Sequence, residues 1–240
     1  MNIFAGKTDI GLKRKNNEDA FIVRKDLGMC VACDGMGGAA AGELASRIFT
    51  DTAIEVFEKD PGRSEDEINY LTKKTFGLAN DRIQSHIEKN PRHAGMGCTA
   101  ELLAFSDKSF VLGHIGDSRT YLLREGVFKQ ITQDHTLVQE QLEAGLIPME
   151  EARNHPLRNV ILRAVGVKKE LVLDLFKGNI FSGDLFVLCS DGLTDMVDDS
   201  QILETLDGDN DIEQSTETLI KMANDAGGKD NITVVMANVL

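Results

Sequence analysis

Apolar residues along the chain gather in short continuous runs separated by polar and glycine-containing stretches. Several of these runs contain β-branched residues or leucine without alternation, as in Leu185-Phe186-Val187-Leu188. Continuous apolar runs of this length are typical of strands that are buried on both faces. They predict strands at about 28–33, 98–106, 109–115, 119–124, 171–176, 184–189 and 232–239.

Helical spacing of apolar residues marks three other segments. The first extends from Ala45 to Phe57. The second begins with Ser64 and has Glu67 three residues later, which is the pattern of a capping box. A third helix is predicted to start near Asn210. The order of strands and helices indicates an α+β fold with a mainly antiparallel sheet system.

The 240 residues contain neither a repeat nor a low-complexity linker, and they include only four prolines. We therefore predict one domain that covers residues 1–240. The segment from Gln133 to Pro156 has weak periodicity and several charges. We interpret it as a candidate flap over a functional site.

Charge and cysteine usage narrow the function classes. Lysine plus arginine number 26 and aspartate plus glutamate 39, which gives a formal net charge of −13. Such a surface disfavours binding to nucleic acid or to anionic membranes. No apolar run approaches the roughly 20 residues that span a bilayer, and residues 1–11 lack the apolar part of a signal peptide. With only four cysteines, these features predict a cytoplasmic protein.

Four aspartates stand where the predicted buried strands end: Asp34, Asp117, Asp191 and Asp230. Strand ends hold side chains rigidly, and neighbouring carboxylates repel unless a divalent cation lies between them. Glycine follows the first and third aspartates, and its missing Cβ makes the Gly35 carbonyl a candidate ligand. Asp-Gly also forms hairpin turns, but no strand pattern follows here. These residues alone leave a metal site and solvated loop acids about equally favoured.

The acids belong to a series of short motifs that extends over nearly the whole chain. The motifs are Thr8-Asp9-Ile10-Gly11, Arg14, Asn17-Glu18-Asp19, Val31-Ala32-Cys33-Asp34-Gly35-Met36-Gly37-Gly38, Gly42-Glu43, Gly97-Cys98-Thr99-Ala100, Gly116-Asp117-Ser118-Arg119, Asp134-His135, His155-Pro156, Leu162-Arg163-Ala164-Val165-Gly166, Cys189-Ser190-Asp191-Gly192-Leu193 and Asp230-Asn231-Ile232-Thr233. Each motif is weak alone. In this order and spacing they resemble the metal-dependent type 2C serine/threonine protein phosphatases (PPM family), in their compact bacterial form.

The resemblance implies a four-layer α-β-β-α sandwich, in which two antiparallel sheets are flanked by helices. It also implies a metal centre at one end of the sandwich. There, Asp34 would bridge two metal ions and Gly35 would give its carbonyl to one of them. Asp191 and Asp230 would complete the other ion's ligands.

The same resemblance implies roles for four further residues. Glu18 and Asp19 would hold metal-bound waters. Asp117 is similar to the acid that helps to bind a third, weaker metal in bacterial members. Arg14 is similar to the arginine that binds the substrate phosphate.

Two oxygen-ligated ions suit Mn²⁺ or Mg²⁺ better than Zn²⁺, which prefers histidine and cysteine. They would lower the pKa of a water, so that hydroxide attacks the phosphate of phosphoserine or phosphothreonine. Eukaryotic relatives often carry a histidine general acid directly after the first Asp-Gly, where this chain has Met36. His135 and a metal-bound water are the alternatives, and we favour the water.

The predicted function is that of a monomeric protein serine/threonine phosphatase, with phosphorylated proteins, including serine/threonine kinases and their substrates, as its partners. One alternative is a phosphopeptide-binding pseudophosphatase, which the retained Asp34, Asp191 and Asp230 disfavour. Another is a dedicated phosphatase of a single regulatory partner. A different two-metal hydrolase, such as a nuclease, is disfavoured by the net charge of −13.

Overall fold

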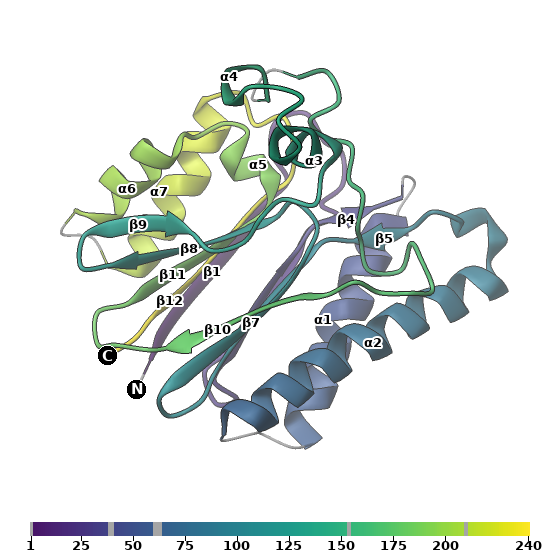
Figure 1. Cartoon of the computed structure of the whole chain (residues 1–240), viewed down its shortest axis with the longest axis horizontal. Helices are drawn as coiled ribbons and strands as arrows, with labels where there is room; N and C mark the ends of the chain where they lie inside the picture. Colours follow the sequence, from purple (N-terminus) through teal and green to yellow (C-terminus); the bar gives the residue numbers. More distant parts are fainter. Residues whose placement is uncertain (1, 38–40, 60–63, 153–154, 209–210) are drawn as a thin grey trace.

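The structure is a computed structural model that describes residues 2–37, 41–59, 64–152, 155–208 and 211–240. Two five-stranded antiparallel sheets pack face to face (Figure 1). In spatial order, the first sheet contains β1 (Ile3–Asp9), β12 (Ile232–Asn238), β11 (Leu185–Cys189), β8 (Arg119–Arg124) and β9 (Val127–Gln130). The second sheet contains β10 (Asp174–Asn179), β7 (Ser109–Ile115), β6 (Ala100–Phe105), β3 (Met29–Cys33) and β2 (Ala20–Arg24). A short pair joins β4 (Gly35–Met36) and β5 (Gly97–Cys98).

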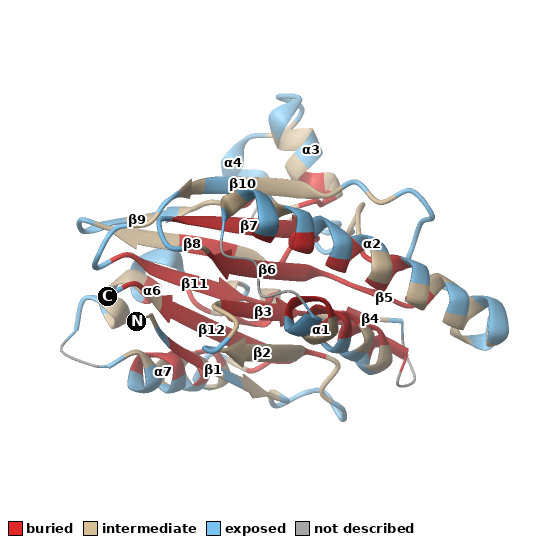
Figure 2. Cartoon of the chain, turned by 90° about the horizontal axis from the view of Figure 1, so that it is seen from below, coloured by how far each residue is buried: buried red, intermediate tan, exposed pale blue. Residues whose placement is uncertain are grey.

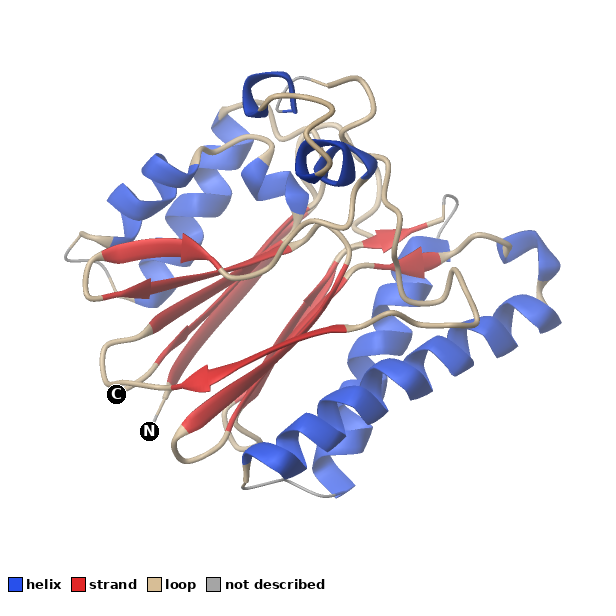
Figure 3. Ribbon diagram, in the orientation of Figure 1, coloured by secondary structure: helices blue, strands red, loops and turns tan. Residues whose placement is uncertain are grey.

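Helices cover the outer face of each sheet (Figure 3). The second sheet is covered by α1 (Ala41–Lys59) and α2 (Glu65–Lys89), and a short 3₁₀ helix, η1 (Pro91–His93), follows them. The first sheet is covered by α5 (Asp191–Thr194), α6 (Asp199–Leu206) and α7 (Ile212–Asp225). The arrangement confirms the expected four-layer α-β-β-α sandwich. No helix of the described residues is long and apolar enough to cross a lipid bilayer.

Successive residues of each central strand point to different apolar layers. In β3, Met29, Val31 and Cys33 face α1 and α2, whereas Cys30 and Ala32 face the other sheet. The side chains of a strand alternate between faces, and here both faces are covered. Figure 2 shows the central strands as buried and the outer helix faces as exposed. Burial on both faces explains why the sequence shows continuous apolar runs.

The strand register gathers the motif-bearing loops at one end of the sandwich. In the second sheet, Cys33 at the end of β3 pairs with Ala20 at the start of β2. In the first sheet, Ile232 at the start of β12 pairs with Asp9 at the end of β1. The loop from Asp9 to Ala20 crosses between the sheets, so it joins these two pairs. The N- and C-termini lie at the opposite end (Figure 1).

The three helices predicted from the sequence correspond to α1, α2 and α7, whereas the shorter helices α3, α4, α5 and α6 were not predicted. Ser64 and Glu67 form the predicted capping box at the start of α2. The helix expected from near Asn210 begins at Ile212, and residue 210 lies outside the described residues. The strand expected at 171–176 is found at 174–179, where it pairs with β7. The sequence patterns did not predict β1, β2 and β9, which are edge strands with partly exposed residues.

The segment from Gln133 to Pro156 contains α3 (Leu137–Glu143) and α4 (Met149–Ala152). Figure 1 shows both helices at the end of the sandwich that carries the motif-bearing loops. Residues 153 and 154 lie outside the described residues. The position fits the flap interpretation, and the mobility of this segment stays a prediction.

Candidate metal centre

Each sequence-predicted acid lies at the loop end of a strand. Asp34 lies between β3 and β4, and Asp191 is the first residue of α5, directly after β11 and Ser190. Asp230 stands two residues before β12, and Asp117 lies in the connection from β7 to β8. Because the register places these strand ends together, residues 34, 117, 191 and 230 approach each other from both sheets.

Electrostatic interactions show that the carboxyl groups lie close together. The pKa of Asp34 is raised well above its ordinary value, first by burial and then by the neighbouring carboxylates of Asp19 and Asp191. The pKa of Asp191 is likewise raised by burial, and then by Asp117 and Asp230. The fold thus concentrates negative charge where the sequence placed its motifs.

Asp19 is a buried member of this group. Its Oδ2 accepts hydrogen bonds from Ser190 Oγ at 2.8 Å and from Thr233 Oγ1 at 2.6 Å. Burial nevertheless raises the pKa of Asp19 to about 6. Burial, together with the carboxylate of Asp134, raises the pKa of Asp117 to about 7. Burial thus shifts both acids toward the protonated form, and an added positive charge would favour the ionised form.

Among the described residues, three buried carboxylate oxygens have no hydrogen-bond partner: Oδ1 of Asp19, Asp117 and Asp191. Buried polar atoms normally have a partner, so such a group of orphaned oxygens requires an explanation. Carboxylate oxygens are the ligands that Mg²⁺ and related hard cations prefer. The residues therefore fit divalent cations in their chemistry. As they stand, no three Asp, Glu, His or Cys side chains of the described residues are arranged to hold one ion.

Asp230 is engaged by neighbours at the surface of the cluster. Its Oδ2 accepts a hydrogen bond from an Arg14 guanidinium nitrogen at 2.5 Å, and its Oδ1 accepts one from the backbone N–H of Asn231 at 2.8 Å. The Arg14 side chain is half exposed. Its pKa is raised mainly by the hydrogen bond to Asp230, and Asp34 and Glu18 contribute. Arg14 is thus a cation at the open edge of the acidic cluster.

Two glycines allow backbone oxygens to crowd beside Asp34. A Cβ on Gly35 would lie 2.2 Å from the carbonyl oxygen of Gly42 and 2.4 Å from that of Glu18. A Cβ on Gly42 would lie 2.6 Å from the carbonyl oxygen of Gly35 and 2.8 Å from Glu18 Oε2. The Gly35 carbonyl oxygen and a Glu18 carboxylate oxygen therefore both lie so close to Gly42 that the Cβ of any other residue would overlap them.

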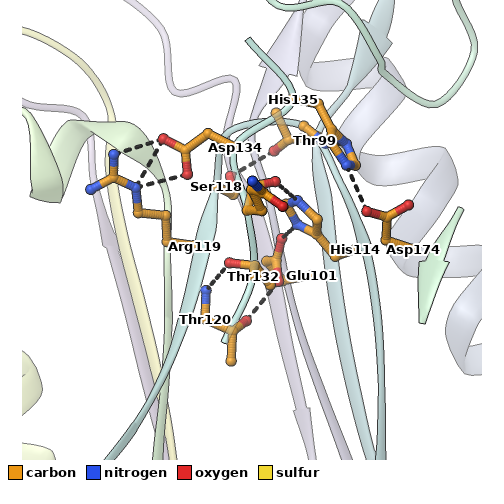
Figure 4. A network of polar contacts seen from close by, with 12 residues as sticks. Thr99, Glu101, His114, Ser118, Arg119, Thr120, Thr132, Asp134, His135 and Asp174 are labelled. Atoms are coloured by element: carbon orange, nitrogen blue, oxygen red, sulfur yellow. Dashed lines mark hydrogen bonds and ion pairs between the residues drawn. The ribbon is translucent and has the colours of Figure 1, made fainter. Parts of the chain in front are cut away.

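A hydroxyl pair fixes the backbone of Asp34. Its N–H donates to Thr99 Oγ1 at 2.9 Å, and its carbonyl accepts from the Thr99 N–H at 2.9 Å. Thr99 Oγ1 also lies 2.7 Å from Ser118 Oγ (Figure 4), and Ser118 directly follows Asp117 in the chain. These contacts link the loop of Asp34 to the connection that carries Asp117.

A buried polar network extends from this connection to the start of the 133–156 segment (Figure 4). Glu101 and His114 are cross-strand partners on β6 and β7 of the second sheet, and their side chains share a short hydrogen bond. Thr120 Oγ1 on β8 donates to Glu101 at 2.6 Å, and His114 Nε2 lies 2.9 Å from the carbonyl oxygen of Gln133. Burial lowers the pKa of His114, but Glu101 more than offsets this and raises it. The network joins both sheets to the base of the flap segment.

His135, the alternative general acid, is occupied by structural contacts. Its Nδ1 accepts from the N–H of Gly116 at 3.1 Å, and its Nε2 lies 3.1 Å from Asp174 Oδ2. Burial, reinforced by His114, lowers the pKa of His135 to about 4. A buried neutral imidazole with both nitrogens engaged is a poor proton donor near pH 7.

A cavity of about 290 Å³ lies between α3 and the 162–172 segment. Ile115, two residues before Asp117, and Arg163 line it. Asp34, Asp191 and Asp230 do not line this cavity. The acidic cluster is therefore identified by its carboxylates and not by an enclosed hollow.

Sequence reasoning missed the residues that hold the acids in place. Thr99, Ser190, Thr233 and Asn231 all lie inside or next to motifs, but nothing in their spacing shows what they contact. Ser190 and Thr233 meet at Asp19 from positions 171 and 214 residues away in the chain. Only their place within the family-like motifs marked them.

Comparisons with known proteins agree with this geometry. A family model described as Protein phosphatase 2C matches residues 12–236. The protein phosphatase PhpP of Streptococcus pneumoniae is 37% identical over 236 residues, which cover 97% of this chain and 95% of PhpP. The crystal structure of the serine/threonine phosphatase PstP/Ppp of Mycobacterium tuberculosis has a TM-score of 0.91 and 39% identity, and the match covers 99% of this chain and 98% of that one. A PstP catalytic domain in complex with 2 manganese ions has a TM-score of 0.90 and 37% identity, covering 100% and 98%.

The chain therefore belongs to the protein phosphatase 2C family.

Proposed function

We propose that this metal-dependent protein serine/threonine phosphatase uses the acids at the end of the sandwich as a two-cation centre. Asp34, the Gly35 carbonyl, Asp191 and Asp230 would hold the two cations, and Asp34 would be the ligand common to both. The orphaned, buried oxygens of Asp19, Asp117 and Asp191 are the observation that carries this assignment. Their raised pKa values describe carboxylates whose ionised form a nearby positive charge would stabilise.

Mn²⁺ or Mg²⁺ is the proposed metal, because the available ligands are all oxygens. When bound, such ions supply an activated water and neutralise phosphoryl charge. Asp117 is the proposed ligand of a third ion, since its Oδ1 is buried and unpaired. Glu18 and Asp19 are proposed to orient ordered waters, and hydrogen bonds from Ser190 and Thr233 hold the Asp19 carboxylate in one orientation.

Arg14 is proposed to bind the substrate phosphate. Its guanidinium lies at the open edge of the cluster and already contacts a carboxylate oxygen of Asp230. A guanidinium binds a phosphate dianion with two parallel N–H bonds, which fixes the orientation of the phosphoryl group. The leaving serine or threonine oxygen takes its proton from ordered water, because both ring nitrogens of His135 are engaged elsewhere.

The test uses purified protein with an aryl phosphate and a phosphothreonine peptide in the presence of Mn²⁺. EDTA should stop turnover, and Asp34→Ala or Asp191→Ala should lose nearly all activity while circular dichroism shows a retained fold. Asp107→Ala is the matched control, because Asp107 is an exposed acid in the β6–β7 turn. Full activity after EDTA treatment would overturn the metal mechanism.

The same assay separates the rival functions. A phosphopeptide-binding pseudophosphatase would bind the peptide without releasing phosphate. A dedicated phosphatase of one regulatory partner would hydrolyse the aryl phosphate but leave unrelated phosphopeptides intact. A broad protein phosphatase, which we favour, hydrolyses both substrates.

We further propose that kinases and their phosphorylated targets are substrates, and that the enzyme acts as a cytoplasmic monomer. The four cysteines are free and buried, as expected of a protein in a reducing compartment. Light scattering tests the monomer, and phosphoproteomics of a deletion strain tests the substrates.

A further inference from the structure

Asn231, the residue after Asp230, has a buried side chain that bonds three backbone groups of the β1–β2 loop. Its Nδ2 donates to the carbonyl oxygens of Ile10 and Asn16, each at 3.0 Å. Its Oδ1 accepts from the N–H of Glu18 at 2.8 Å. Both amide hydrogens and the carbonyl oxygen are therefore in use.

These bonds hold together the two ends of a backbone arc, which extends from Ile10 to Asn16. Ile10 and Asn16 are six positions apart, and one amide group holds both. The arc between them carries Arg14, whose side chain is half exposed and reaches Asp230. Another contact holds the first half of the arc: the N–H of Leu12 donates to the carbonyl oxygen of Gly228 at 2.7 Å.

Asn231 also lies against the helix that presents Asp191. A Cβ on Gly192 would lie 1.9 Å from the Asn231 carbonyl oxygen, so the two backbones are in close contact. One residue thus connects the arc that carries Arg14 with the backbone beside Asp191 and Asp230. A shift of the arc relative to these acids requires that the Asn231 bonds break.

We propose that Asn231 is a positioning residue for the substrate phosphate, which acts by holding the arc so that Arg14 faces the acidic cluster. The inference rests on the proposed role of Arg14. A long, exposed arginine loses side-chain freedom when it binds, and a fixed backbone reduces the further cost of ordering the loop. Asn231 therefore makes the phosphate-binding conformation the populated one.

The test measures competitive inhibition by inorganic phosphate, together with KM and kcat for an aryl phosphate, in saturating Mn²⁺. We expect Asn231→Ala to reduce the fraction of molecules whose arc has the phosphate-binding conformation to about one tenth. The apparent Kd scales inversely with that fraction, so the Ki for phosphate and the KM should both rise about tenfold. Asn231→Ser, whose shorter side chain cannot hold both carbonyl oxygens, should also raise the Ki. This second variant keeps the test decisive if Asn231→Ala does not fold.

Asn80 on α2 provides a matched control. Its Nδ2 donates to the carbonyl oxygens of Lys168 and Lys169 at 3.1 and 3.2 Å, and its Oδ1 accepts from the N–H of Gly166 at 2.7 Å. Asn80→Ala therefore removes the same set of bonds from a different loop. We expect a similar fall in the melting temperature and no tenfold rise in the Ki for phosphate. An equal rise would show that the effect is one of general stability and would overturn the inference.

A double-mutant cycle with Arg14→Ala identifies the route of the effect. If Asn231 acts through Arg14, Asn231→Ala should raise the Ki little further in the Arg14→Ala background. A full tenfold rise in that background would overturn the inference, as would an unchanged Ki in Asn231→Ala alone. An unchanged Ki in Arg14→Ala would instead refute the proposed role of Arg14. The two failures are therefore distinguishable.

Discussion

Removal of divalent cations is expected to make the stability of the fold depend on pH in a window set by the buried acids. In the metal-free protein the pKa of Asp19 rises from 3.8 to about 6, and burial is the main cause. A raised pKa means that the folded state holds a proton that the unfolded state has lost. The free energy of unfolding therefore falls as the pH rises from about 4 to about 6, and it stays low above that.

The magnitude follows from the size of the shift. A rise from 3.8 to about 6 corresponds to about 3 kcal/mol, because one pKa unit is worth about 1.36 kcal/mol. Asp117, raised to about 7, extends the window upward. The two penalties do not simply add, since the acids share charged neighbours. A bound cation favours the ionised form and should remove most of the dependence.

The assay is thermal unfolding from pH 4 to pH 8 with EDTA and, separately, with Mn²⁺. For a protein of this size, about 3 kcal/mol corresponds to roughly 6–12 °C in the melting temperature. The EDTA curve should fall by that order relative to the Mn²⁺ curve. Asp19→Asn should remove the part of the fall that Asp19 contributes, because the amide stays neutral, and leave the part due to Asp34, Asp117 and Asp191, whereas the exposed Asp107→Asn should leave the whole fall unchanged. Parallel curves with EDTA and Mn²⁺, or an unaltered slope in Asp19→Asn, would refute the reasoning.

Three further outcomes are expected. Glu101→Ala should lower the free energy of unfolding by about 3–5 kcal/mol in urea titrations, because it leaves His114 buried without its carboxylate partner. Ser64→Ala should cost about 1 kcal/mol through loss of the α2 capping box and leave kcat unchanged, so a lower kcat would contradict a purely local role. Gly192→Ala should cost about 1–3 kcal/mol and reduce Mn²⁺ affinity in calorimetry, because its Cβ would overlap the Asn231 carbonyl; wild-type affinity would argue against this contact.

The sequence determined the elements whose signals are local. Continuous apolar runs located the central strands, because residues of β3 and β11 are buried on both faces. The Ser64–Glu67 spacing located the start of α2, because a capping box lies within one turn. The edge strands β1, β2 and β9 were missed, since their pairing partners and not their own patterns make them strands.

For the site, the sequence identified the candidate acids but not the residues that hold them in place. The ordered motifs selected Asp34, Asp191 and Asp230, which are separated by up to 196 positions. Only the tertiary structure revealed that Asn231 closes the arc of Arg14 and that Ser190 and Thr233 share Asp19. Such hydrogen bonds join residues far apart in the chain, and one hydroxyl or amide in a motif does not specify its partner. The strand register decides which partner each group meets, because the register sets which loop ends lie side by side.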